Sequence, residues 1–249
     1  MEFWDCNISY GPDTMKGQLP GCPGLNGLIA QLDRAGVTGG LVYYAMEEPI
    51  LGNATLACDL QTYVHRLFGV WSILPSCTGE TPPPSELPAL MKQNGIAALT
   101  VNPQANRFLP RPSAIGDYLD MACERAIPVI LNTGRGITIS EADDLMGNFP
   151  GLTVILSYKN CWPNDRTLRP FLRAYKNLYL DMTSMQTAAG LASITDMFPA
   201  ERILFGSGFP ESYMGSHMTV IKHAPVGDGD RALIAGGNLR RILKGARYG

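Results

Sequence analysis

Histidine and charged side chains are scarce in this sequence. Three histidines occur in 249 residues, and Asp, Glu, Lys and Arg together make up 17% of the chain. The formal net charge is −2 and no run of Lys or Arg is present, so nucleic acid is not an expected partner. No stretch of about 18 apolar residues is available to cross a membrane, and the N-terminus lacks the charged and apolar regions of a signal peptide. These absences predict a cytoplasmic protein that binds neither nucleic acid nor membrane.

The cysteines and histidines are too dispersed to form a metal motif. The sequence has no C-x-x-C pair and no His-x-His spacing. We therefore expect His65, His217 and His223 not to meet at a metal. Cys161 is a candidate nucleophile, but no histidine lies near it in the sequence, and a reduced, buried thiol is favoured. The same reduced and buried state is expected for most of the six cysteines, which are Cys6, Cys22, Cys58, Cys77, Cys123 and Cys161.

Apolar residues, by contrast, are plentiful and regularly spaced. They make up 45% of the chain, and short runs rich in Val, Ile and Leu alternate with segments of helical period. That pattern is typical of parallel strands covered on both faces by helices. Eight such units fill the 249 residues, which predicts one (β/α)₈ TIM-barrel domain spanning residues 1–249.

The expected elements follow from this spacing. Strands are predicted at residues 2–8, 39–45, 70–74, 97–102, 128–132, 153–157, 178–182 and 202–205. Helices are predicted at residues 25–35, 54–68, 85–92, 115–125, 140–146, 167–175, 188–197 and 230–243, with Ser140 and Asp143 capping one of them. Two long loops, 11–24 and 211–228, follow the first and last strands. Because such loops crown the ligand-binding face of a barrel, we expect both to cover a site.

Several strand-end stretches carry a family pattern with its histidines replaced. Residues 5–11 read D-C-N-I-S-Y-G, residues 128–134 read P-V-I-L-N-T-G, and Tyr158 follows the strand predicted at 153–157. Residues 177–181 read N-L-Y-L-D, residues 202–210 read R-I-L-F-G-S-G-F-P, and residues 234–243 read I-A-G-G-N-L-R-R-I-L. Together these stretches resemble the amidohydrolase-related family that includes carboxymuconate-semialdehyde-type decarboxylases. The resemblance spans nearly the whole chain and implies the same barrel fold.

The resemblance also locates the family's metal site. Where the family carries D-x-H-x-H, a histidine after strand five, another after strand six and an aspartate after strand eight, this chain has Asn7, Ser9, Asn132, Tyr158 and Gly208. Amide and hydroxyl oxygens are poor ligands for catalytic zinc, and glycine has no side chain. The sequence therefore predicts no bound metal and no cofactor, and with the aspartate it loses the family's general base.

Polar residues at the ends of barrel strands still predict a ligand pocket. Asn7, Ser9 and Asn132 are expected to line it, and Arg135 and Lys159 to contact a carboxylate. The favoured hypothesis is a catalytically degenerate barrel that binds a small, carboxylated molecule or serves as a partner subunit. A homo-oligomer is compatible with either role.

Two alternatives remain open. A metal-independent hydrolase or lyase, of the lactonase or decarboxylase kind, would use Tyr158 or Asp181 as acid or base, with Asn7 and Asn132 donating to an oxyanion. Asp181 has a competing structural role, since aspartate commonly bonds to nearby backbone. A pure scaffold would instead fill the barrel mouth with its own loops.

Overall fold

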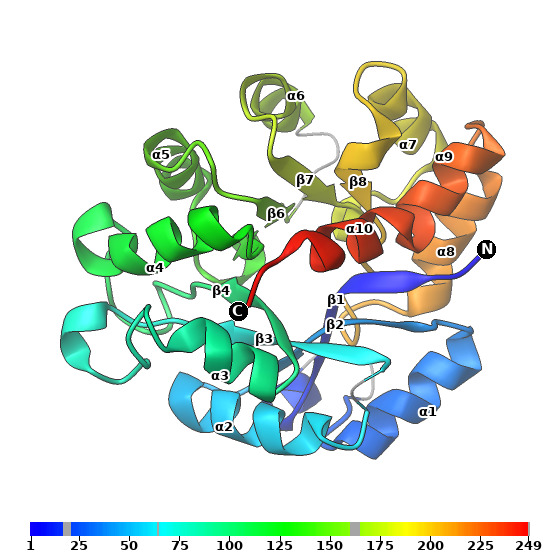
Figure 1. Ribbon diagram of the computed structural model, residues 1–249. Coiled ribbons are helices and arrows are strands. Elements are labelled where there is room, and N and C mark those ends of the chain that lie inside the picture. Colours follow the sequence, from blue (N-terminus) through cyan, green and yellow to red (C-terminus); the bar gives the residue numbers. More distant parts are fainter. Residues whose placement is uncertain (17–20, 64, 160–164, 249) are drawn as a thin grey trace.

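The chain folds as a barrel of eight parallel strands surrounded by helices (Figure 1). The computed structural model describes residues 1–16, 21–63, 65–159 and 165–248. The strands pair in chain order and are β1 (Trp4–Tyr10), β2 (Gly39–Tyr44), β3 (Leu67–Ser72), β4 (Ile96–Thr100), β5 (Val129–Asn132), β6 (Val154–Ser157), β7 (Leu178–Asp181) and β8 (Ile203–Leu204). The predicted TIM-barrel class is thereby confirmed.

The helices lie on the outside of the barrel, in the connections between strands (Figure 1). They are α1 (Leu25–Ala35), α2 (Pro49–Leu60), α3 (Leu87–Gln93), α4 (Pro112–Arg125), α5 (Ile139–Asn148), α6 (Asp165–Ala174), α7 (Ala188–Thr195), α8 (Met214–His223), α9 (Asp228–Ala232) and α10 (Asn238–Gly245). A π-helical turn, Leu233–Gly237, joins α9 to α10. No helix in the described ranges is both long and apolar enough to cross a membrane.

The barrel closes between its last and first strands. The Cys6 amide donates to the Phe205 carbonyl over 2.9 Å, and the Gly208 amide donates to the Asn7 carbonyl over 3.0 Å. The Ser9 amide donates to the Phe209 carbonyl over 2.9 Å. These bonds run past the short β8 and continue the ladder along the chain that follows it. They place residues 205–209 beside β1, at the mouth of the barrel.

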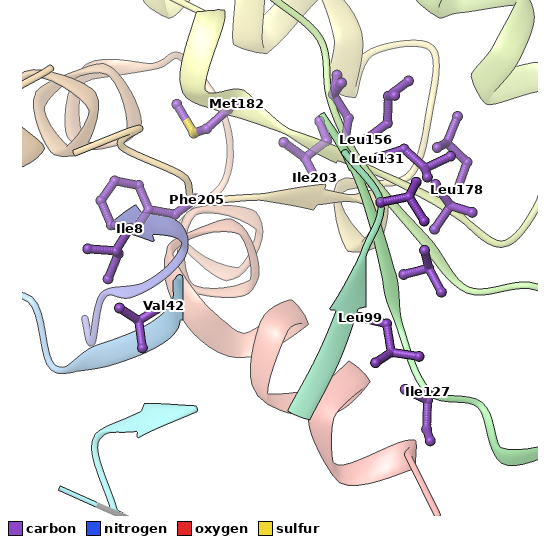
Figure 2. Close-up of a cluster of buried hydrophobic side chains, with 14 of the residues drawn as sticks. Ile8, Val42, Leu99, Ile127, Leu131, Leu156, Leu178, Met182, Ile203 and Phe205 are labelled. Atoms are coloured by element: carbon purple, nitrogen blue, oxygen red, sulfur yellow. The ribbon is translucent and has the colours of Figure 1, made fainter. Parts of the chain in front are cut away.

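Strand side chains alternate between two apolar clusters, as the period of two requires. On β6, Val154 and Leu156 belong to the larger cluster between strands and helices, whereas Ile155 belongs to a smaller cluster inside the barrel. Figure 2 shows part of the larger cluster, to which Ile8 contributes from β1 and Phe205 from the chain directly after β8. Both faces of the strands are therefore buried in apolar surroundings.

The C-terminal helix closes the bottom of the barrel. Leu239 and Ile242 of α10 are buried in the inner cluster, against which Trp4 and Tyr179, near the starts of β1 and β7, also pack. Figure 1 shows α10 lying across the end of the ring of strands. The opposite end, where the strands terminate, is left for the functional site.

Several predicted elements are shifted or wrong. The helix expected at 54–68 is α2, which begins at Pro49 because proline suits the first turn and the Glu48 carboxylate accepts from the Ile50 amide over 3.1 Å. His65 consequently lies outside the helix, and β3 begins at Leu67, three residues before the predicted start at residue 70.

The cap of α5 and the last long loop are also corrected. Thr138, not Ser140, caps α5: its hydroxyl accepts from the Glu141 amide over 3.2 Å, and the Glu141 carboxylate accepts from the Thr138 amide over 2.8 Å. The predicted loop 211–228 contains α8, and the helix predicted at 230–243 begins two residues earlier, at Asp228.

Candidate functional site

Two adjoining cavities open at the ends of the strands. The larger has a volume of ≈ 700 Å³ and extends over the ends of β2, β3 and β4, whereas the smaller, of ≈ 190 Å³, lies over the ends of β5, β6 and β7. Residues shared by both cavities are Ser9, Arg135, Lys159, Glu211 and Ser212. The mouth is therefore one polar hollow with two lobes, and Asp13 and Thr14 from the predicted 11–24 loop line the larger lobe.

Six of the seven predicted site residues line this hollow. Asn7, Asn132 and Tyr158 face the smaller lobe, and Ser9, Arg135 and Lys159 line both lobes. The ends of neighbouring parallel strands meet at one edge, which is why residues so distant in sequence come together. Asp181 lines neither lobe.

Asp181 lies beneath the smaller lobe, at the centre of a hydrogen-bond network. Its Oδ2 accepts from the Asn7 amide Nδ2 over 2.9 Å and from the Ser157 hydroxyl. Its Oδ1 accepts from the Thr183 amide over 2.8 Å and from the Thr183 hydroxyl over 2.7 Å. The residue is 1% exposed. Both oxygens are occupied by donors from β1, β6 and the turn after β7, so this carboxylate ties three parts of the barrel together.

Short turns after the strands position the cationic residues. The Asn132 Oδ1 accepts from the Gly134 amide over 2.8 Å and caps the 3₁₀ turn Thr133–Arg135, which places Arg135 above β5. The Thr133 hydroxyl accepts from the Lys159 amide over 2.8 Å, which holds the start of the next loop beside this turn. Arg135 and Lys159 therefore sit on backbone that is fixed by side-chain bonds.

Gly208 stands where the family resemblance places an aspartate, and its surroundings are closed to a side chain. Its φ is +68°, in the left-handed region that favours glycine. A Cβ added there would lie 2.5 Å from the Thr183 Cγ2 methyl. At Gly206 a Cβ would lie 1.9 Å from the Asp181 Oδ1. The Asp181 network thus fills the space beside the chain after β8.

The larger lobe carries the features that the sequence did not predict. The Arg135 guanidinium carbon lies 4.1 Å from the centroid of the Tyr43 ring, and Tyr43 is 3% exposed. Its hydroxyl, the Asn102 Oδ1 and the Asn106 Oδ1 are buried without a hydrogen-bond partner among the described residues. Burial raises the pKa of Tyr43 above its ordinary value, so its hydroxyl stays protonated. No family motif marks these positions, and only the ends of β2 and β4 in the fold bring them together.

A second buried acid lies beside the closing seam. The Asp5 Oδ1 accepts from the Asn7 amide over 2.9 Å and from the Ser207 amide over 3.0 Å, and its Oδ2 has no partner among the described residues. Burial raises the pKa of Asp5 to about 7, against the lowering effect of these bonds. The neighbouring Cys6 thiol is buried as well, and its desolvation raises the pKa of this thiol well above its ordinary value.

The remaining candidates lie outside the mouth. His217 is buried in α8, where its Nε2 lies 2.6 Å from the Thr183 carbonyl oxygen, while His65 and His223 are exposed. Cys6 and Cys22 are buried as expected, but Cys58 and Cys77 are exposed, so the prediction of buried thiols was wrong for these two. Cys161 lies outside the described residues. Within the described part of the chain, no cluster of three or more His, Cys, Asp or Glu side chains is arranged to hold a metal ion.

Comparison with known proteins decides the family. A family model described as Amidohydrolase matches residues 60–245. The chain belongs to the amidohydrolase family. The chain matches no functionally curated protein sequence.

Solved structures resemble this chain over nearly its full length. An uncharacterised TIM-barrel protein from Bordetella bronchiseptica is 20% identical, with a TM-score of 0.73 and coverage of 98% of this chain and 99% of the other. The 5-carboxyvanillate decarboxylase from Sphingomonas paucimobilis is 13% identical, with a TM-score of 0.72 and coverage of 98% and 99%. A dihydroxybenzoic acid decarboxylase from Polaromonas, solved with manganese and 2-nitroresorcinol, is 14% identical, with a TM-score of 0.72 and coverage of 98% and 97%. At these identities the likeness establishes the fold alone.

Proposed function

We propose that this amidohydrolase-family barrel binds a small carboxylate in its mouth and does so without a resident divalent cation. The observation that carries the proposal is the placement of Arg135 and Lys159 on the wall shared by both lobes, above strand ends that line the lobes with neutral side chains while the Asp181 carboxylate stays buried beneath them. A guanidinium forms paired bonds to a carboxylate, and a lysine adds a point charge. On the shared wall these two cations face one acidic residue, Glu211, whereas Asp13 and Glu47 line the larger lobe alone; the net positive charge is therefore confined to the shared wall.

The donor set at the family's metal position does not fit a catalytic transition-metal ion. Asn7 already donates its amide to Asp181, and Asn132 already uses its Oδ1 to cap a turn. The Ser9 hydroxyl donates to the Phe209 carbonyl over 3.2 Å. The remaining groups are the Tyr158 phenol and the backbone at Gly208, neither of which replaces imidazole or carboxylate. We therefore derive no chemical step through a metal.

The geometry also argues against Asp181 as a general base. A base must reach the proton it abstracts within hydrogen-bond distance. Asp181 is buried beneath the hollow and lines neither lobe, and its two oxygens are occupied by protein donors. This supports a catalytically degenerate barrel in which Asp181 holds the mouth in shape.

A metal-independent lyase or hydrolase is the second candidate, and one observation favours it. Tyr158 and Lys159 both line the smaller lobe, and a phenol that faces a cavity is able to act as a proton donor. The Asn132 Nδ2 is the amide group left to donate to a developing oxyanion. The decarboxylase structures named above support this reaction class only in general terms, through the shared fold.

Calorimetry on the purified protein tests the first proposal. After exhaustive chelation, zinc and manganese are titrated, followed by a panel of small carboxylates that includes benzoate and hexanoate. We expect no stoichiometric metal binding and saturable binding of at least one carboxylate, weakened tenfold or more by Arg135→Gln. The same substitution at Arg34, an exposed residue of α1, is the matched control and leaves affinity unchanged. One tightly held ion per chain, or no carboxylate binding, contradicts the proposal.

A further inference from the structure

The Lys159 side chain is exposed at the barrel mouth and does not help to hold the barrel together. Its backbone is anchored, because its amide donates to the Thr133 hydroxyl over 2.8 Å. Among the described residues, no carboxylate forms an ion pair with its ammonium group. The side chain nevertheless lines both lobes of the hollow. An amine on anchored backbone at a cavity wall is well placed to act on a bound molecule.

The aliphatic stem of Lys159 runs beside the turn that carries Arg135. Its Cδ lies 3.5 Å, and its Cβ 4.0 Å, from the position that a Cβ would take at Gly134. Gly134 directly precedes Arg135, and the two strands that lead to these residues are paired, with Asn132 of β5 opposite Ser157 of β6. The amine and the guanidinium therefore start from adjoining points of the rim and line the same wall.

The two cations differ in what each can do for one ligand. The Arg135 guanidinium carbon lies 4.1 Å from the centroid of the Tyr43 ring, which fixes the direction of this side chain. A guanidinium stays charged and binds a carboxylate through paired bonds. A lysine amine is in addition a nucleophile that forms Schiff bases with carbonyl groups. A carboxylate bound by Arg135 would bring a carbonyl group on the adjacent carbon toward the Lys159 Nζ.

We propose that Lys159 forms a Schiff base with a short-chain 2-oxo acid whose carboxylate is bound by Arg135. The neutral amine attacks the carbonyl carbon and forms a C–N bond, and the two amine protons leave with the carbonyl oxygen as water. Nothing is oxidised or reduced in this step. Glu211 lines the same wall and supplies a carboxylate able to carry these protons. The inference rests on the proposed function, because the bound carboxylate is what places the carbonyl group.

Trapping with sodium borohydride tests the covalent step, because this reagent reduces an imine to a stable secondary amine. Protein incubated with pyruvate and borohydride should gain the mass of pyruvic acid less one oxygen atom, and peptide mapping by mass spectrometry should place this label on Lys159. Lys159→Arg keeps the positive charge, so it should still bind carboxylates in calorimetry while it loses the label. Lys176→Arg, at an exposed position just before β7, is the matched control and should keep the label.

The contribution of Arg135 is measured by the rate of labelling. Arg135→Gln should slow labelling by pyruvate about tenfold or more, since the carboxylate then loses its paired bonds. Acetone has no carboxylate and should label the parent protein and this variant equally slowly. In 4-oxopentanoate the carbonyl group lies two carbons further from the carboxylate, so this acid should label Lys159 more slowly than pyruvate does.

The outcomes distinguish this inference from the function beneath it. If pyruvate binds in calorimetry but leaves no label on Lys159, or if Lys159 and Lys176 are labelled equally, the Schiff base is wrong while carboxylate binding stands. Equal labelling rates in Arg135→Gln and the parent would likewise overturn the assignment of the 2-oxo acid. If no carboxylate binds at all, the proposed function fails and the inference fails with it. Thermal unfolding of each variant, compared with the parent, verifies that a lost label is not lost folding.

Discussion

The Arg135 guanidinium carbon lies 4.1 Å above the centre of the Tyr43 ring, so the cation that we assign to ligand binding is held by an aromatic face. A cation stacked on a ring gains about 0.5–2 kcal/mol, depending on its exposure. Without the ring, Arg135 would lose the surface that orients it toward the cavity. The stacked pair thus combines charge with a fixed direction.

Substitution of the ring tests this relationship. Tyr43→Leu should weaken carboxylate binding several-fold to about thirtyfold, since the stacking energy of about 0.5–2 kcal/mol then no longer orients Arg135. Tyr43→Phe keeps the ring that stacks on Arg135 and should therefore retain the affinity for hexanoate. Calorimetric titration of both variants makes the comparison. Equal affinity in Tyr43→Leu and the parent protein would show that Arg135 needs no aromatic support.

Asp181 is predicted to stabilise the fold. Asp181→Asn replaces an acceptor oxygen by an amide group facing the Asn7 and Ser157 donors, and should lower the free energy of unfolding by about 2–4 kcal/mol. Ser157→Ala, which removes one donor and leaves the carboxylate bonded to the others, should cost only about 1 kcal/mol. Urea denaturation measures both. A fully stable Asp181→Asn variant would argue that this carboxylate is kept for chemistry instead.

The stability of the protein should fall with rising pH because of Asp5. Burial raises the pKa of Asp5 in the folded protein to about 7, from 3.8 for an aspartate in water. Between about pH 4 and 7 the folded chain keeps a proton that the unfolded chain has released, so stability decreases as pH rises through this window. The contribution is of the order of a few kcal/mol.

Asp5→Asn removes this titration while its side-chain oxygen still accepts from the Asn7 and Ser207 amides. We expect the variant to match the parent near pH 4 and to be the more stable of the two near pH 8. Denaturation curves at a series of pH values give the difference directly. Parallel pH profiles for the two proteins would rule out a raised Asp5 pKa.

A side chain at position 208 should collide with Thr183. Gly208→Ala is expected to cost about 2–4 kcal/mol, because the left-handed backbone disfavours a Cβ and the Thr183 methyl lies 2.5 Å from it. In a Thr183→Ser background the methyl is gone and the cost should shrink by about 1–2 kcal/mol. A double-mutant cycle in urea measures this coupling, and strictly additive effects would contradict the steric account. For the same reason, Gly208→Asp should not by itself create a metal site.

The sequence predicts the strand-end residues well, because the fold class fixes where they go. Asn7, Ser9, Asn132 and Tyr158 each lie within one residue of the end of a predicted strand, and all four line the mouth. Counting βα units is sufficient to bring them together, since every parallel strand ends at the same rim. The errors in helix 54–68 and loop 211–228 did not disturb this result, because they moved element boundaries and not the order of strands.

The rest of the site depends on contacts that no local pattern encodes. Among the described residues, the buried Tyr43 hydroxyl, Asn102 Oδ1 and Asn106 Oδ1 lack hydrogen-bond partners, and this is known only once all neighbours are placed. Likewise, the position of Asp181 at a strand end suggests a carboxylate that is free to contact a ligand. The hydrogen bond that this carboxylate accepts from Asn7, 174 residues away in the chain, is seen only in the three-dimensional structure.

Because α10 covers one end of the barrel, the cavity opens only at the other end, where the strands terminate. A ligand must bind and dissociate through the same opening, so a bound ligand blocks the entry of the next one. The rim residues, among them Arg135, Lys159 and Glu211, therefore control the rates of ligand association and dissociation. Substitutions at the rim should alter the residence time of a ligand even when its contacts deeper in the cavity are unchanged.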